Sequence, residues 1–233
     1  MAPLQTSQND FLATIGTDGE LALHLALQEP CGARRQQLEG FIGERFAEHY
    51  GARVRHFMPC LLGLYDAAQQ LHAALGVRCG GQGALFLERY LDMPVEQRIA
   101  ELNGSSQLPV RGQIAEVGNL AALGAGHARL LIVALTDLLA AAGFRWVAFT
   151  GTSLLLNSFQ RLGLSLLHLG PADGARMGDE LADWGSYYAT QPQVMVGDVL
   201  ACHQRLQALG IYRRLGYRPS YLLDGEFAHV ACG

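Results

Sequence analysis

Residues 115–172 decide the fold: AEVGNLAALGAGHARLLIVALTDLLAAAGFRWVAFTGTSLLLNSFQRLGLSLLHLGPA. Apolar runs with turns between them alternate with helical stretches. Their order predicts a strand at 113–121, a helix at 126–142, a strand at 145–150, a helix at 153–162 and a strand at 164–169. Gly143 stands where a glycine commonly ends a helix. The pattern therefore predicts two parallel strands joined by a helix inside an α/β domain.

The turn after the first of these strands is made largely of small residues. Small residues let a ligand approach the backbone, and the free amides at the start of a helix attract anions. We therefore expect the turn to bind a phosphate-bearing cofactor through Leu123, Gly124, Ala125, Gly126, His127 and Arg129. The alternative is an ordinary strand-to-helix turn, in which glycine is common and a short motif is weak evidence.

Composition narrows the class of protein. Half of the 233 residues are hydrophobic and 16% are charged, with a net charge of −4 and no lysine. A protein that reads nucleic acid would carry a basic stripe, so that class is disfavoured. The low share of charged residues fits a lipid-like substrate, a partner or a membrane face or, more simply, a chain rich in alanine and glycine. The five cysteines are scattered, without metal-ligand spacing or a disulfide framework.

The N-terminal segment has no basic stretch followed by a long apolar run, so we expect no secretory signal. The most apolar helix, 130–142, is interrupted by Thr136 and Asp137 and is too short to span a bilayer. With the scattered cysteines, this favours a cytoplasmic protein without a bound metal.

The flanking segments complete the predicted domain. Residues 1–32 read as an arm or hairpin with a strand at 20–25, and the remainder, 33–233, reads as a single domain without a linker. Further predicted elements are an amphipathic helix at 33–50, strands at 53–65 (broken by Pro59) and 71–79, a short apolar element at 84–90, a helix at 94–102, and a strand followed by a helix within 193–207.

Several side chains are candidates for a site. Glu116 lies on an apolar strand, where burial would raise its pKa and suit it to act as a base, or it is an exposed partner of Arg111 or Arg129. Thr150, Thr152 and Asn157 follow the carboxyl end of a strand, where open α/β sheets bind ligands, although Thr152 or Ser153 can instead cap the next helix. Arg78 and Glu88 are candidate substrate-binding residues on neighbouring elements, which can pair across a site or form a surface salt bridge. The other candidates, Trp184, Tyr187 and Tyr188, can line an acyl tunnel or contact lipid, or can pack over the sheet.

Four segments carry a family likeness. EVGNLA, RWVAFTGT, NSFQRLGL and DWGSYY, in this order and spacing, resemble the thermostable hemolysin family of bacteria, and RFAEHYGARVRHFMPCLL, ALGVR and LFLERYLDMP fit the same family. The likeness runs from about residue 34 to about residue 197. More distantly, the same segments resemble the autoinducer synthases that make acyl-homoserine lactones, which have the GNAT acyltransferase fold.

The resemblance implies an α/β fold with a mixed, mostly antiparallel, twisted sheet flanked by helices. It implies transfer of a fatty acyl group from a thioester of coenzyme A or acyl carrier protein to a small amine. Glu116 would accept the proton of the amine, with Asn119 beside it in the catalytic site. The synthases carry an arginine where this chain has Asn119, and their acidic residues near 65–70 are reduced here to Asp66, so the use of S-adenosylmethionine is left open. The family's name suggests a membrane-active lytic protein instead, and a third hypothesis is a non-catalytic GNAT-like domain that binds a partner.

Overall fold

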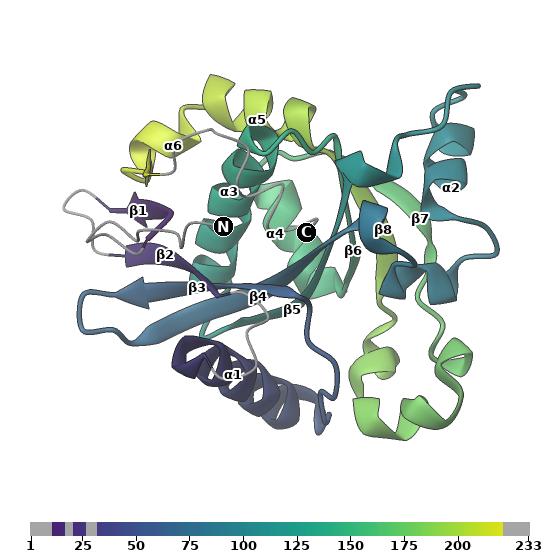
Figure 1. The fold of residues 1–233 in the computed structure, drawn as a ribbon, viewed down its shortest axis with the longest axis horizontal. Coiled ribbons are helices and arrows are strands. Elements are labelled where there is room, and N and C mark those ends of the chain that lie inside the picture. Colours follow the sequence, from purple (N-terminus) through teal and green to yellow (C-terminus); the bar gives the residue numbers. More distant parts are fainter. Residues whose placement is uncertain (1–10, 17–20, 27–31, 221–233) are drawn as a thin grey trace, which may run out of the picture.

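The computed structural model describes residues 11–16, 21–26 and 32–220. One nine-stranded sheet runs through the molecule in the order β7-β8-β6-β5-β4-β3-β2-β1-β9 (Figure 1). Its strands are β1 (Ala13–Ile15), β2 (Leu21–Ala26), β3 (Cys60–Asp66), β4 (Leu71–Cys79), β5 (Ile114–Ala122), β6 (Trp146–Gly151), β7 (Leu167–Pro171), β8 (Gln193–Asp198) and β9 (Arg218–Pro219). Every neighbouring pair is antiparallel except β5 and β6, which are parallel.

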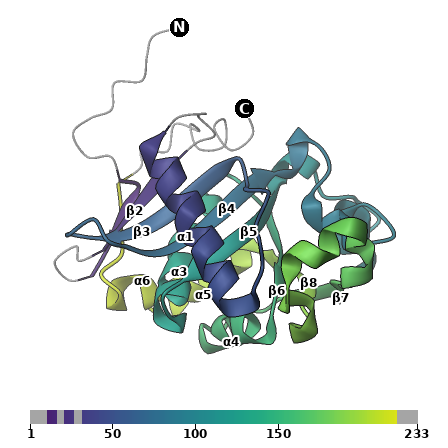
Figure 2. The same ribbon diagram turned by 90° about the horizontal axis from the view of Figure 1, so that it is seen from below.

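Helices cover both faces of the sheet. α1 (Ala33–Tyr50) crosses one face, as Figure 2 shows, and we call this the α1 face. The opposite face, the α3 face, is covered by α3 (Ala125–Ala141), α4 (Ser153–Arg161), α5 (Val199–Ala208) and α6 (Ile211–Arg214). A further helix, α2 (Val95–Leu102), lies beside β7. The mixed sheet between two helical layers agrees with the predicted fold class.

Alternating side chains of the strands fill two cores. Leu62, Leu64, Leu75 and Val77 pack against α3, whereas Leu61 and Tyr65 pack against Leu38 and Ile42 of α1, to list the main contacts. This alternation is the two-residue period of a strand that is buried on both faces. α3 is apolar nearly all round because it also contacts α4 and α5 through Ile132 and Val133.

The predicted central unit is confirmed. β5 and β6 are parallel neighbours, and α3 joins them. Gly143 follows the helix with φ +81°, the left-handed conformation that favours glycine at a helix end.

The two parallel strands part near their carboxyl ends. Their pairing stops at Val117 opposite Phe149. β5 nevertheless continues along β4 to Ala122, and β6 continues along β8 to Gly151. The backbones of β5 and β6 therefore diverge on the side where α3 and α4 begin.

Three expectations need correction. The strand predicted at 53–65 begins only at Cys60, because 51–58 is an irregular segment tied to other elements by side-chain hydrogen bonds. The apolar element at 84–90 is a 3₁₀ segment, η2 (Phe86–Tyr90). Cys79 is disulfide-bonded, whereas Cys60 and Cys202 are buried thiols.

The N-terminal hairpin forms as expected within the described residues. β1 pairs with β2, and β2 pairs in turn with β3, so the hairpin extends the main sheet. The parts of the predicted arm at 1–10, 17–20 and 27–31 lie outside the described residues.

Candidate functional site

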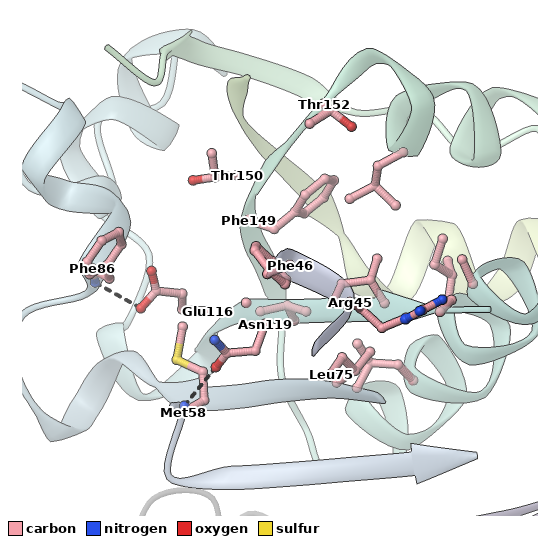
Figure 3. Close-up of a pocket in the computed structure, with 18 of the residues that line it drawn as sticks. Arg45, Phe46, Met58, Leu75, Phe86, Glu116, Asn119, Phe149, Thr150 and Thr152 are labelled. Atoms are coloured by element: carbon pink, nitrogen blue, oxygen red, sulfur yellow. Dashed lines mark hydrogen bonds between the residues drawn. The ribbon is translucent and has the colours of Figure 1, made fainter. Parts of the chain in front are cut away.

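A cavity of about 400 Å³ lies where β5 and β6 diverge (Figure 3). Its walls come from both faces of the sheet. Leu75, Leu135 and Val147 belong to the α3 face, whereas Met58 and Glu116 belong to the α1 face. The cavity therefore passes through the sheet between two strands that no longer pair. Its size is that of a typical small-molecule site.

Glu116 lies in the wall of this cavity and is only 2% exposed. Its carboxylate accepts hydrogen bonds from the backbone N–H groups of Phe86 (2.9 Å) and Leu87 (2.8 Å), one on each oxygen. Burial raises the pKa of Glu116, while the two amides and the charge of Arg78 oppose that rise. The alternative of an exposed residue paired with Arg111 or Arg129 is wrong, because the carboxylate is buried and holds η2 to the sheet.

Asn119 occupies a bulge in β5. Gly76 lies opposite Gly118, yet Ala74 lies opposite Ala121, so β5 holds one residue more than β4 between the two pairs. Asn119 has φ +53°, a left-handed conformation that asparagine tolerates better than most residues. Its side-chain oxygen accepts the Met58 N–H (2.9 Å), and its nitrogen donates to the His56 carbonyl (3.2 Å). Asn119 therefore positions the 56–58 segment, which forms part of the cavity wall.

Two glycines of the family segments make room for Met58. A Cβ at Gly76 would come within 2.4 Å of the Met58 Cβ, and one at Gly118 within 2.6 Å of its terminal methyl. Met58 therefore lies flat on the sheet beside Glu116 (Figure 3).

The starts of α3 and α4 both reach the cavity. Leu123, Gly124 and Ala125 line it at one helix, and Thr150 and Thr152 line it at the other. Neither Gly124 nor Thr152, the two N-cap residues, caps its helix through a side chain. The Thr152 side chain instead forms a hydrogen bond with the Tyr50 hydroxyl. Burial raises the pKa of Tyr50, and this hydrogen bond opposes part of the rise.

Four other predicted cofactor residues lie apart from the cavity lining: Gly126, His127, Arg129 and Asn157. The His127 ring packs 4.7 Å from the ring of His72, which hydrogen-bonds Asp66 at 2.9 Å. Burial and the neighbouring His72 lower the pKa of His127. The structure therefore brings together only the first half of the predicted phosphate-binding turn.

The predicted substrate-binding residues divide in the same way. Arg78, Trp184 and Tyr187 line the cavity. Glu88 does not pair with Arg78, since it forms a salt bridge to Arg111 with a distance of 2.7 Å. Tyr188 packs behind the wall, where its hydroxyl lies 2.7 Å from that of Tyr90.

An aromatic wall was only partly predicted from the sequence, which named Trp184 and Tyr187 but not the other rings. It lies on the α1 face and consists of Phe46, Tyr50, Phe86, Tyr90, Trp184 and Tyr187. Tyr187 contacts the rings of Tyr50 (5.2 Å) and Trp184 (5.4 Å). Phe46 and Tyr50 stand four residues apart on one helical face, which was the available signal, but an aromatic stripe of this kind also fits an ordinary core.

Other kinds of site are not evident in the described part of the chain. There, no three His, Cys, Asp or Glu side chains are grouped so that they could hold a metal ion. Among the same residues, no helix has the length and apolar character needed to cross a bilayer.

Known proteins resemble this chain in sequence and in fold. The thermostable hemolysin family model matches residues 28–203, and no curated protein matches in sequence. The solved structure of the CoA-dependent acyl-homoserine lactone synthase BjaI with SAM and isopentyl-CoA has a TM-score of 0.54 at 14% identity, covering 84% of this chain and 92% of BjaI.

Two further solved structures show the same fold. FeeM, an N-acyl amino acid synthase from uncultured soil microbes, has a TM-score of 0.52 at 12% identity, covering 80% of this chain and 96% of FeeM. The acyl-homoserine lactone synthase LasI has a TM-score of 0.51 at 12% identity, covering 77% of this chain and 90% of LasI. The resemblance read from the sequence is confirmed: the chain belongs to the thermostable hemolysin family and has the GNAT-like fold of the acyl-homoserine lactone synthases.

Proposed function

We propose that this protein transfers a fatty acyl group from a thioester of coenzyme A or acyl carrier protein to a small amine. The observation that carries the proposal is the divergence of β5 and β6 around a cavity that passes through the sheet, with a helix start on each strand's carboxyl side. A long thin donor with a phosphate end fits this geometry. Fold alone does not establish the reaction, because one fold supports many activities.

The donor would thread between the two strands. Beyond Val117 and Phe149 the facing backbone edges no longer pair with each other, so their amides are free to bind an extended pantetheine arm. The amides at the start of α3 would bind phosphate. The acyl chain would enter the apolar part of the cavity, among residues such as Leu135, Leu139 and Phe149.

In the transfer step the amine nitrogen attacks the thioester carbonyl carbon. The C–S bond breaks, an amide bond forms, and the sulfur leaves and takes up a proton to become the free thiol. Glu116 would accept the amine proton, directly or through a water molecule. Its raised pKa favours this role, because a base works best when its pKa approaches the working pH.

The named ligands and products of the structural neighbours support a thioester donor. BjaI is described as CoA-dependent and was solved with isopentyl-CoA, and FeeM is described as an N-acyl amino acid synthase. A cytoplasmic location, where such donors are made, belongs to the same proposal.

One observation favours a second candidate, a GNAT-like domain that binds a thioester without transferring it. Both oxygens of Glu116 already accept backbone hydrogen bonds, so the carboxylate has a structural role that does not require catalysis.

The donor is tested by thermal unfolding with free coenzyme A and with saturated acyl-CoA esters of increasing length. A ligand that binds only the folded state adds about 2.7 kcal/mol of stability at a hundred times its dissociation constant. We expect longer chains to raise the melting temperature further, since each buried methylene adds about 0.8 kcal/mol, until the cavity is full.

Release of free thiol upon addition of an amine then separates the two candidates. Binding with release supports transfer, and binding without release supports the non-catalytic domain. If neither an acyl-CoA nor an acyl carrier protein thioester changes the melting temperature, the donor site is disproved.

A further inference from the structure

The charged groups around the cavity indicate the kind of amine that fits. Among the residues that the structure describes, four arginines and three acids line it: Arg45, Arg53, Arg55 and Arg78, with Glu116, Glu180 and Asp183. Most of them are already paired. Arg45 pairs with Glu48, Arg55 with Asp183, and Glu180 with Arg89.

The charges left over are the cations Arg53 and Arg78 and the carboxylate of Glu116. Arg53 lies at the exposed rim, whereas Arg78 is half-buried on β4. In the described part of the chain, the Arg78 guanidinium makes neither a hydrogen bond nor an ion pair. Because Arg78 lines the cavity, its donors are available to a ligand there, and a guanidinium is well suited to bind a carboxylate through two hydrogen bonds.

Arg78 and Glu116 stand directly opposite each other on neighbouring antiparallel strands. Residues in that relation project to the same face with their Cβ atoms roughly 5 Å apart. The two groups nonetheless form no ion pair, because Glu116 is turned toward the amides of η2. A cation and an anion thus lie side by side in one cavity without neutralising each other directly.

We propose that the acceptor is an α-amino acid, with its carboxylate bound by Arg78 and its amino group beside Glu116. This inference rests on the acyl transfer proposed above and specifies its second substrate. An α-amino acid carries its positive and negative groups on one carbon, so its charge pattern is the complement of the Arg78–Glu116 pair. Amines without a carboxylate would leave Arg78 unpaired, and polycationic amines would meet Arg53 and Arg78 as like charges.

The reaction has a definite product. The amino group enters as an ammonium and gives one proton to Glu116, which passes it to water. The neutral amine then attacks the thioester carbonyl carbon and the C–S bond breaks. The second proton lost by the nitrogen goes to the departing sulfur, which leaves as the thiol. The product is an N-acyl amino acid that keeps its carboxylate on Arg78.

The acceptor is tested with the standard L-amino acids and their primary amides, using an acyl-CoA as donor and thiol release as readout. The amides lack only the carboxylate and are the more easily deprotonated amines, so unassisted chemistry favours them. We expect the wild-type protein to prefer free amino acids. Arg78→Gln should raise the KM for an amino acid by roughly 10- to 100-fold, the value of a charge-assisted hydrogen bond, and leave the KM for the amide unchanged.

Arg213→Gln is the matched control, because Arg213 is exposed on α6 and does not line the cavity. Arg78→Lys keeps the positive charge but lacks the planar guanidinium, so its KM for an amino acid should lie between those of the wild type and Arg78→Gln. Arg78→Lys and Arg213→Gln should melt at the wild-type temperature, whereas Arg78→Gln loses the attraction between Arg78 and Glu116 and should melt slightly lower. Equal use of amino acids and amides, or equal KM values for Arg78→Gln and Arg213→Gln, would overturn the proposal.

Calorimetric binding of amino acids separates this inference from the function on which it rests. Binding that requires Arg78, in a protein that transfers no acyl group, would support the carboxylate site and contradict the acyltransferase. Equal transfer to amines with and without a carboxylate would support the acyltransferase and contradict the carboxylate site.

Discussion

Glu116 combines a buried carboxylate with two backbone hydrogen bonds. The sequence predicted the burial but not the hydrogen bonds. Its place on an apolar strand predicted a perturbed carboxylate, and the structure agrees, since burial raises its pKa. The contacts to Phe86 and Leu87 could not be predicted, because thirty residues along the chain separate the partners and the donors are backbone groups that carry no sequence signal. Asn119 could likewise be named as a site residue, but its bulge could not be predicted, because the bulge depends on how β5 pairs with β4.

Glu116→Gln tests both roles of this residue. The amide removes the basic group, so acyl transfer should fall by roughly 10²- to 10⁴-fold. Glutamine offers one acceptor oxygen where glutamate offers two, so one backbone N–H of η2 would face the NH₂ group. We expect the free energy of unfolding to fall by about 1–3 kcal/mol, measured in urea. Glu101→Gln, an exposed change on α2, is the control and should alter neither quantity.

The pH dependence of this stability loss has a definite sign. Because the pKa of Glu116 is raised in the folded state, the folded protein holds this proton more tightly than the unfolded chain does. The stability contributed by the group is therefore greatest at acid pH and declines as the pH rises through the folded pKa. The deficit of Glu116→Gln relative to the wild type should shrink over that range, and a deficit that grows instead would show that the folded protein favours the ionised carboxylate.

At the scale of elements, the periodicity of apolar residues predicted which segments are helices or strands, and in what order, for most of the described chain. The helix expected at 33–50 is α1, and the strand and helix within 193–207 are β8 and α5. The divergence of β5 and β6 was not predicted, because it depends on which strands pair beyond Val117. The prediction that a strand begins at Arg53 was wrong, because apolar residues such as Val54 and Phe57 line the cavity and do not extend β3.

Gly124→Asp separates the stability of α3 from the binding of an anion at its start. α3 has no acidic residue in its first turn, so an aspartate at its N-cap should stabilise the protein by roughly 0.3–1 kcal/mol. The same charge would repel the donor phosphate, and we expect the affinity for coenzyme A to fall at least about tenfold.

Gly32→Asp is the paired control for this change. Gly32 is the N-cap of α1, which also lacks an acidic first turn, and it does not line the cavity. This variant should gain similar stability and bind coenzyme A as the wild type does. If Gly124→Asp binds coenzyme A with unchanged affinity, the start of α3 does not bind the donor phosphate.

At the scale of the whole molecule, the sequence predicted a mixed sheet between helical layers and a family, both of which are confirmed. The division into an arm at 1–32 and a single domain at 33–233 stays a prediction, and β1 and β2 already show the arm joined to the sheet by pairing with β3. The cavity was beyond the sequence because its walls come from elements far apart in the chain. Phe46, Arg78, Phe149 and Trp184 meet only after the sheet has formed.

The family's name raises the question whether the whole molecule lyses membranes, and red-cell lysis by the purified protein answers it. A lytic protein needs its membrane-contacting surface and not the chemistry of a buried carboxylate, so wild type and Glu116→Gln would lyse cells equally. An acyltransferase whose product is an N-acyl amphiphile predicts a different result. Lysis should require added acyl donor and acceptor, should follow the rate of thiol release, and should be lost in Glu116→Gln, while medium from the wild-type reaction, freed of protein by filtration, should lyse cells by itself. We expect this second result, because the Arg78–Glu116 pair and the apolar residues proposed to hold the acyl chain line one cavity that passes through the sheet. Equal lysis by both proteins without added substrates would instead make the family name literal and contradict the proposed function.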